Sequence, residues 1–231
     1  MSQARRPHTS RNALSQPPPK ESARASILSS AMHIIAEGGD RAATFRSVAT
    51  AAGVSHSLLQ HHFGTKRGLV AAVEGMVAER FSAALATTTT DAQAASNEIA
   101  AGLSGLIAGD AKLRNYLRRA LLEATPAGRA LFARIADLVV RQLEQHGDPK
   151  TLPSGSQLAW LAVEVIAVNL AGVIFEPILA RTLREKPFDP EVVAWRTEAN
   201  RRFIVAALKE YVPSRRQRGG IAMRGGAAIR L

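Results

Sequence analysis

Hydrogen-bonding side chains gather in one short stretch of the sequence, residues 44–63, which reads TFRSVATAAGVSHSLLQHHF. Its second half holds the polar residues Ser55, His56, Ser57, Gln60 and His61. Serine and glutamine side chains suit both the edges of DNA bases and phosphate oxygens. Taken alone, the residues are equally compatible with two packed helices that expose a polar face to water.

The histidines of this stretch raise the question of a metal site. His61 and His62 follow His56 by five and six positions, whereas a helix brings two ligands together at a spacing of three or four. No carboxylate accompanies them. We therefore predict no metal site, and we expect His62 to pack the end of a helix.

The sequence shows no arrangement of residues that is typical of a catalytic site. It contains no cysteine, which excludes disulfides, thiolate nucleophiles and thiolate metal sites. The sequence shows no grouping of nucleophile, base and acid and no glycine-rich phosphate loop. We predict that the protein is not an enzyme and uses no cofactor.

Helical periodicity surrounds the polar stretch. Apolar residues recur on one helical face between positions 27 and 35, and two glycines then end that helix. Thr44 and Ser55 are placed to cap two short helices, and Gly53 permits a tight turn between them. Such a pair forms a helix-turn-helix, whose second helix, here residues 55–61, can enter a major groove.

The remaining chain is divided into further helices by caps, glycines and prolines. We expect them at about 65–86, 91–108, 110–123, 125–146, 154–181 and 189–212. No segment shows the alternation of a strand. We predict an all-α fold of about nine helices in total.

Composition marks both ends of the chain as basic tails. Residues 1–20 and 213–231 are predicted to be disordered, which leaves two domains at 21–75 and 76–212. Of the formal net charge of +11, residues 1–24 contribute +4 and 213–231 contribute +5. Such tails attract phosphates without regard to sequence, although a merely solubilising role explains them equally well.

One long apolar stretch, from Trp160 to Phe175, could be taken for a membrane span. It is interrupted by Glu164 and Asn169 and is too short to cross a bilayer. The polar, basic N-terminus also lacks the apolar segment of a secretory signal. We predict a buried helix, no membrane association and a cytoplasmic location.

Residues 24–75 resemble the DNA-binding domain of the TetR family of tetracycline-repressor-like regulators. The resemblance rests on the string GVSHSLLQHHFGTKRGL, residues 53–69, and on residues before it, namely Arg24, Ile27, Ala31, Gly38, Gly39, Thr44, Val48, Ala49 and Ala52. It implies an N-terminal three-helix domain with the helix-turn-helix, followed by an α-helical ligand-binding and dimerisation domain.

The resemblance also implies which residues contact DNA. Thr44 and Lys66 would hold backbone phosphates, Lys66 at a helix N-terminus that already favours anions. His61 would contact a phosphate or a base edge. The residues that would face bases begin the recognition helix: Ser55, His56, Ser57 and Leu58.

This sequence departs from the family pattern at two positions of the recognition helix. Gln60 stands where the family usually has a tyrosine that touches phosphate, and Ser57 stands where it usually has glycine. Glutamine can form two hydrogen bonds to adenine. We therefore predict that Gln60 is a base-reading residue.

In the family the last long helices pair across a twofold axis, so we expect a homodimer through the helices near 154–181 and 189–212. Six residues are candidates to line a pocket for a small apolar ligand: Tyr116, Phe132, Trp160, Glu164, Asn169 and Phe175. Glu164 and Asn169 stand out because burial of polar groups without partners is costly. Alternatively, these side chains bond across the dimer or face solvent.

The resemblance implies a sequence-specific transcriptional regulator. It would be a homodimeric repressor that binds double-stranded operator DNA and is released by a small ligand. The alternative is a DNA-binding regulator without a small-molecule ligand, controlled by its abundance or by a protein partner. A fully packed C-terminal core would favour the alternative.

Overall fold

Ten helices and no strand make up the residues that the computed structural model describes, 20–147 and 152–210. The predicted all-α class is confirmed. The predicted tails lie outside the described residues, apart from Lys20, which begins the first helix. The helices are α1 (Lys20–Ala42), α2 (Phe45–Ala52), α3 (His56–Phe63), α4 (Lys66–Leu85), α5 (Ala92–Gly109), α6 (Ala111–Glu123), α7 (Pro126–His146), α8 (Ser156–Ile174), α9 (Glu176–Thr182) and α10 (Pro190–Glu210).

Side-chain caps set where the short N-terminal helices begin. The hydroxyls of Thr44 and Ser55 accept hydrogen bonds from the backbone N–H groups of Ser47, at 3.1 Å, and Leu58, at 3.2 Å. Gly53 ends α2 in the left-handed conformation, with φ of 67°. These features satisfy orphan backbone groups and fix the predicted helix-turn-helix.

The helix predicted at 154–181 is wrong as a single element, because it is divided at Phe175 into α8 and α9. Pro177 explains the break. It has no N–H to donate to the Val173 carbonyl, and its ring would clash with that carbonyl in a continuous helix. The Val173 carbonyl instead accepts a hydrogen bond from Arg118 at 3.3 Å. This division raises the number of helices above the expected nine.

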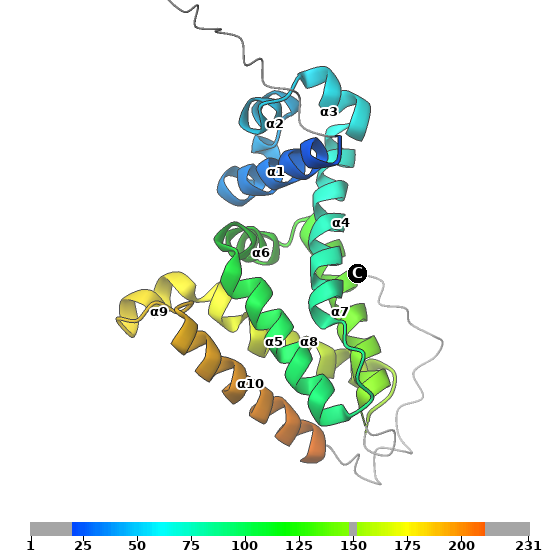
Figure 1. The fold of residues 1–231 in the computed structure, drawn as a ribbon, viewed down its shortest axis with the longest axis vertical. Coiled ribbons are helices and arrows are strands. Elements are labelled where there is room, and N and C mark those ends of the chain that lie inside the picture. Colours follow the sequence, from blue (N-terminus) through cyan, green and yellow to red (C-terminus); the bar gives the residue numbers. More distant parts are fainter. Residues whose placement is uncertain (1–19, 148–151, 211–231) are drawn as a thin grey trace, which may run out of the picture.

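The helices form an elongated body with α1–α3 at one end (Figure 1). α4 runs from that end into the remaining bundle, where it packs against α5 and α7. Its buried side chains, Val73, Val77 and Phe81, continue one hydrophobic core from the N-terminal helices into the bundle. A shift of α4 therefore affects both parts.

α6 is the main contact of the bundle with α1. Near the end of α1 the backbone kinks at Gly39, with φ of 72° and ψ of 179°. Arg119 of α6 donates hydrogen bonds to the carbonyls of Glu37, at 2.9 Å, and Ala36, at 3.3 Å. The guanidinium thus bonds two backbone carbonyls just before the kink.

By length and composition α8 could cross a membrane. It packs instead against α6, α7 and α10. Its inward side chains Leu161, Ile166 and Leu170 are buried. One face of α8 is thus buried in the bundle, whereas its outer face exposes Trp160 and Glu164, so the helix is buried on one side and not all round as predicted.

Candidate nucleic-acid interface and interior cavity

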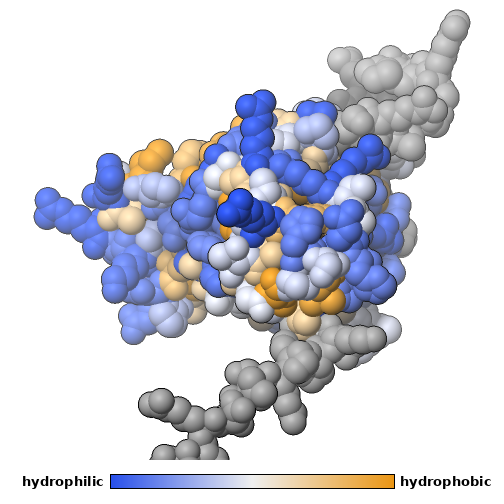
Figure 2. Space-filling view, turned by 90° about the horizontal axis from the view of Figure 1, so that it is seen from above, coloured by the Kyte–Doolittle hydropathy of each residue, from blue (hydrophilic) through white to orange (hydrophobic). Residues whose placement is uncertain are grey.

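The outer face of α3 is polar and exposed. Leu59 is fully buried and Leu58 is half-buried against the core, and these contacts hold the helix against the domain. The predicted contact residues Ser55, His56, Ser57, Gln60 and His61 are all exposed. Viewed from the end of the molecule that carries this helix, most of the surface is hydrophilic (Figure 2). The structure thus brings five of the predicted residues together, while Leu58 serves partly as packing.

Two neighbours order the start of α3. The ring of His56 meets the ring of Phe45 edge to face, with 5.7 Å between centroids. The hydroxyls of Ser55 and Ser57 lie 3.1 Å apart and share a hydrogen bond. Contacts of this kind restrict the rotamers of the side chains that would meet base edges.

Thr44 and Lys66, the predicted phosphate ligands, are exposed but engaged in the protein itself. The N–H of Thr44 donates to the Ala42 carbonyl at 2.8 Å and to Ser47 Oγ at 3.0 Å. Lys66 Nζ donates to the Arg41 carbonyl at 3.1 Å. An ammonium group has three donors, so Lys66 retains capacity for a phosphate. In this structure Thr44 acts as a helix cap.

The segment that contains α2 and α3 carries basic side chains and no acidic ones. From Arg41 to Val73 the sequence contains no Asp or Glu. Its four basic residues are all exposed: Arg41, Arg46, Lys66 and Arg67. The three arginines were not predicted, because basic and acidic residues nearly cancel over the whole body of the chain. The lack of Asp and Glu from Arg41 to Val73 was the sequence feature that could have revealed these arginines.

A cavity of about 640 Å³, here called the interior cavity, lies among the end of α4 and the helices α5, α7, α8 and α10, and it opens to the surface beside the exposed residues Asp91 and Gln93. Its wall is mainly aliphatic, including Leu85, Ile99, Leu103, Val139 and Val165. Deeper polar groups at the wall include Gln142, His146, Asn169 and Arg201. The volume lies within the range of sites that bind small molecules.

Of the six predicted pocket residues, the structure brings Asn169 to this cavity. Tyr116 is 2% exposed in the core, and Phe132 packs half-buried against the same core. Trp160, Glu164 and Phe175 lie at the surface instead, with Trp160 68% exposed.

Helical geometry explains this placement. Trp160, Glu164 and Phe175 share the outer stripe of α8, whereas Val165 and Asn169 share the inner one. Most of the cavity wall comes from α5, α7 and α10, and nothing in their sequences distinguishes wall from ordinary core.

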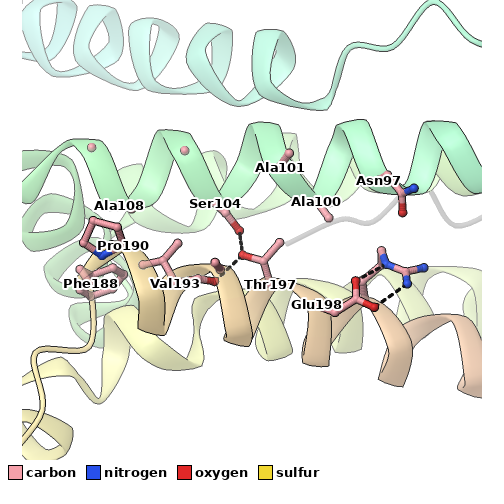
Figure 3. Close-up of a pocket in the computed structure, with 14 residues that line it drawn as sticks. Asn97, Ala100, Ala101, Ser104, Ala108, Phe188, Pro190, Val193, Thr197 and Glu198 are labelled. Carbon is pink, nitrogen blue, oxygen red and sulfur yellow. Dashed lines mark hydrogen bonds and ion pairs between the residues drawn. The ribbon is translucent and has the colours of Figure 1, made fainter.

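A second hollow, of about 760 Å³, follows the seam between α5 and α10 (Figure 3). Ser104 of α5 and Thr197 of α10 share a hydrogen bond across it. Glu198 lies farther along α10 and binds Arg201, which with Ala100 lines both this groove and the interior cavity. The two hollows are therefore neighbours.

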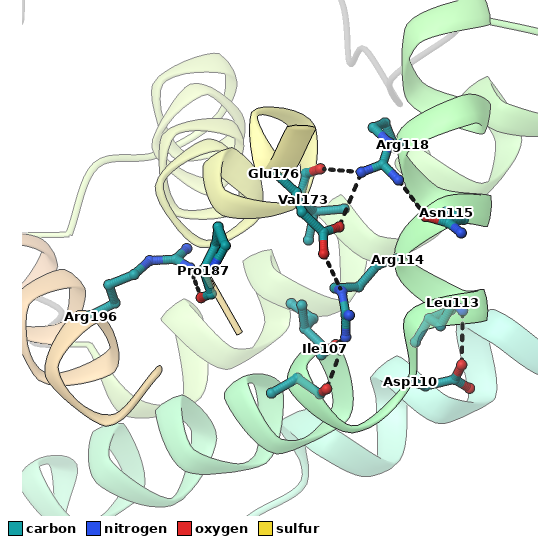
Figure 4. A network of polar contacts seen from close by, with 11 residues as sticks. Ile107, Asp110, Leu113, Arg114, Asn115, Arg118, Val173, Glu176, Pro187 and Arg196 are labelled. Carbon is teal, nitrogen blue, oxygen red and sulfur yellow. Dashed lines mark hydrogen bonds and ion pairs between the residues drawn. The ribbon is translucent and has the colours of Figure 1, made fainter. Parts of the chain in front are cut away.

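Arginines of α6 hold α9 in place (Figure 4). Arg118 Nη1 donates to Glu176 at 3.1 Å, and Arg114 Nε lies 3.4 Å from the other carboxylate oxygen. The Arg114 guanidinium also stacks over the Phe188 ring, 4.1 Å from its centroid. With Arg119 bound to α1, one helix connects the N-terminal domain to α9.

The comparisons with known proteins agree with this geometry. Residues 27–73 match the model of a family described as bacterial regulatory proteins, tetR family. The fold is similar to that of a TetR-like transcriptional regulator from Rhodococcus sp. RHA1, with 16% identity, a TM-score of 0.60 and coverage of 83% of this chain and 98% of that one. No curated protein matches the sequence.

Two further solved structures share this fold. The fatty acid degradation regulator FadR from Bacillus halodurans is 17% identical, with a TM-score of 0.61 and coverage of 82% of this chain and 96% of that one. A TetR transcriptional regulator from Legionella pneumophila is 20% identical, with a TM-score of 0.53 and coverage of 79% and 95% respectively.

Proposed function

We propose that this chain, whose residues 27–73 match the tetR family of bacterial regulatory proteins, binds operator DNA as a homodimer. In this proposal it represses transcription until a small ligand releases it from the DNA. The observation that carries the proposal is the outer face of α3. This face is polar and exposed, and it belongs to a segment without acidic residues.

In this proposal, α3 recognises the base sequence of the DNA. Ser55, His56, Ser57 and Gln60 would meet base edges in the major groove. Lys66 and the exposed arginines beside α3 would hold phosphates, which supplies affinity and orientation without sequence preference.

Dimerisation through α8 and α10 is supported by exposed aromatic side chains. Trp160 is 68% exposed, Trp195 is 72% exposed and Phe203 is 63% exposed. Large exposed apolar groups along two adjoining helices favour a role for this face in association. Twofold pairing of these helices would present two copies of α3 to the two halves of a palindromic site.

Release by a ligand is supported by the interior cavity. A ligand that binds one arrangement of the helices more tightly shifts the population toward it. α4 lines the cavity at Leu85 and begins at Lys66 beside the recognition helix. A regulator controlled only by its abundance or by a protein partner would have no use for an aliphatic cavity of about 640 Å³.

Selection of bound fragments from randomised duplex DNA, at physiological salt, tests the proposal. We expect the purified protein to recover one palindromic site whose half-sites lie at least about one helical turn apart. Recovery of sequences without a common site would contradict sequence-specific binding.

The variant Gln60→Ala identifies the reading residue in the same selection. We expect it to relax the preference at one position of each half-site, at a cost of about 1–3 kcal/mol. Arg129→Ala, an exposed residue of α7, serves as the control and should recover the same site as the native protein.

A further inference from the structure

We infer that the interior cavity takes an uncharged aliphatic molecule that carries one hydrogen-bonding group, and that Asn169 is the residue that recognises this group. The inference rests on the proposed function, since it names the class of ligand to which the regulator responds. Three properties of the wall carry it: the kind of apolar surface, the engagement of two of its charged groups and the free capacity of one amide.

The apolar wall of the cavity is aliphatic. Leu103, Val139 and Val165 face Ile204 and Val205 of α10 across it. None of the described residues that line the cavity is Phe, Trp or Tyr. Apart from the imidazole of His146, the wall therefore provides no ring for cation–π binding of an ammonium or for stacking of a flat aromatic ligand. It provides the non-directional contact that suits a saturated hydrocarbon.

Of the ionisable side chains at the wall, Arg201 and Asp91 are already engaged within the protein, and His146 is the third. Nε and Nη2 of Arg201 each lie 2.8 Å from an oxygen of Glu198, so the guanidinium holds both oxygens of one carboxylate. Hydrogen bonds from Arg201 and Arg202 lower the pKa of Glu198 to about 2, which keeps the pair ionised. Asp91 accepts the N–H of Ala94 at 2.7 Å as the cap of α5.

An ionised ligand that used Arg201 or Asp91 would have to break one of these arrangements. A carboxylate would have to displace Glu198 from Arg201, and an ammonium would have to draw Asp91 from its cap. An ionised ligand that left both arrangements intact would bring its charge into a mainly aliphatic site without an oppositely charged partner from either residue, which is costly. A neutral molecule avoids this cost.

Asn169 provides the polar contact. Its Nδ2 donates to the Val165 carbonyl one turn earlier, at 2.8 Å, and this bond holds the amide in position on the inner face of α8. A carboxamide has a second N–H and a carbonyl oxygen with two lone pairs. Within the described ranges no hydrogen bond to Oδ1 of Asn169 is present. A hydroxyl or carbonyl of the ligand can therefore pair with an acceptor or donor that is already oriented.

Three probes with the same chain length test the charge argument: 1-decanol, decanoate and decyltrimethylammonium. Their dissociation constants for the full-length protein are measured by calorimetry. We expect 1-decanol to bind at least about tenfold more tightly than either ion. Stronger binding of decanoate or of the ammonium would overturn the inference, as would failure of all three to bind.

Two variants test the role of Asn169. Asn169→Leu preserves the size of the side chain and removes its hydrogen bonds, so we expect it to weaken 1-decanol binding by about tenfold. The matched control is Asn200→Leu. Asn200 also donates to a carbonyl of α8, that of Val168 at 3.3 Å, but does not line the cavity. This control should bind 1-decanol as the native protein does.

Equal affinity of Asn169→Leu and the native protein would show that the amide serves only the helix, and would overturn its assignment. Loss of affinity in Gln142→Leu alone would assign the recognition to Gln142, whose Oε1 is buried without a partner among the described residues. The melting midpoints of the Asn169→Leu, Asn200→Leu and Gln142→Leu proteins are measured without ligand and compared with that of the native protein, so that loss of folding is recognised.

Binding of the protein to the DNA site recovered in the selection experiment separates this inference from the proposed function. If 1-decanol binds with the expected preference but the protein binds no specific DNA, the regulator is refuted and the ligand class stands. If specific DNA binding is found and the ions bind as well as the alcohol, the regulator stands and the ligand class is refuted.

Discussion

Lys66 illustrates how one exposed charge can serve both fold and function. Its ammonium group bonds the Arg41 carbonyl at the end of α1, and its backbone lies at the N-terminus of α4, where the helix dipole favours an anion. A phosphate bound here would meet the charge and the free N–H groups together.

The variant Lys66→Ala measures this contribution. We expect it to weaken binding to all DNA sequences alike and to reduce the slope of log affinity against log salt by about 0.9 for each phosphate that is no longer neutralised. Lys112→Ala, an exposed lysine of α6, should leave the slope unchanged. A slope unaltered by Lys66→Ala would contradict the phosphate assignment.

Glu74 of α4 carries a carboxylate in an unfavourable place. Burial raises its pKa above the ordinary value of 4.5, and the negative charge of Asp40 adds to this effect, against the attraction of Arg134. Burial raises the pKa of Tyr116, and the negative charges of Glu74 and Asp40 raise it further. These groups therefore face one another where α1, α4 and α6 meet.

A pH series of melting curves tests Glu74. Because the raised pKa means that the folded protein holds this proton more tightly, the native protein loses stability as the pH rises through that pKa. We expect Glu74→Gln to melt at a higher temperature than the native protein near pH 7, and at nearly the same temperature near pH 4. Glu79→Gln, an exposed residue of the same helix, should show no such divergence. A constant difference between Glu74→Gln and the native protein would contradict the assignment.

At the scale of elements, α6 connects α1 to α9. Arg119 binds the carbonyls at the kink of α1, while Arg114 and Arg118 bind Glu176. Arg119 Nε also lies 2.8 Å from Glu123, although it is not aligned for a hydrogen bond. A displacement of α9 or α8 would therefore be transmitted to the N-terminal domain through side chains of one helix.

Arg119→Met removes this link and retains much of the side-chain volume. We expect the free energy of unfolding to fall by about 1–3 kcal/mol, because hydrogen bonds to a charged group are removed and carbonyls are left unpaired. Arg129→Met, which removes an exposed arginine bonded to the Ala124 carbonyl at 2.7 Å, should cost less than about 1 kcal/mol. Equal losses of stability in the two variants would show that Arg119 has no special role.

Prolines, glycines and caps decide where helices begin and end, and here sequence reasoning was wrong at two points. Thr44 and Ser55 cap as predicted, and Asp91 and Thr125 cap helices that were expected to begin there. The helix expected to end at Gly38 and Gly39 only kinks at Gly39 and continues to Ala42. The other exception is Pro177, because the apolar residues around it continue a helical pattern that predicts one long helix. Its missing N–H outweighs that pattern and divides α8 from α9.

For the whole molecule, the exposed aromatic residues of α8 and α10 predict assembly. Gly172 of α8 packs under Arg196, and Asn200 bonds the carbonyl of Val168. The two helices are thus antiparallel neighbours within one subunit. A second copy of the same pair would cover Trp160 and Trp195, which are among the most exposed apolar side chains.

Trp160→Glu tests the dimer by placing a charge in the proposed interface. We expect it to shift the protein to a monomer in sedimentation equilibrium and to lower operator affinity by at least about tenfold, since one reading helix then binds alone. Leu122→Glu is the matched control. Leu122 is an apolar residue of α6 with 65% exposure, and its variant should remain a dimer. A dimeric Trp160→Glu protein would place the interface elsewhere.

The amino-acid sequence was enough to predict the helical class, the helix-turn-helix, most caps and the face of α3 that is exposed. These features depend on neighbours within about one turn of the chain, so spacing and residue type suffice to predict them. For the same reason the five polar residues of α3 could be chosen from their spacing and chemistry.

The tertiary structure alone decided which residues line the cavity and which lie at the surface. Trp160 and Asn169 occupy the same apolar stretch, yet one is exposed and the other faces the cavity. The difference depends on how α5, α7 and α10 approach α8. Such approaches are set by the packing of side chains far apart in the sequence, which no local pattern records.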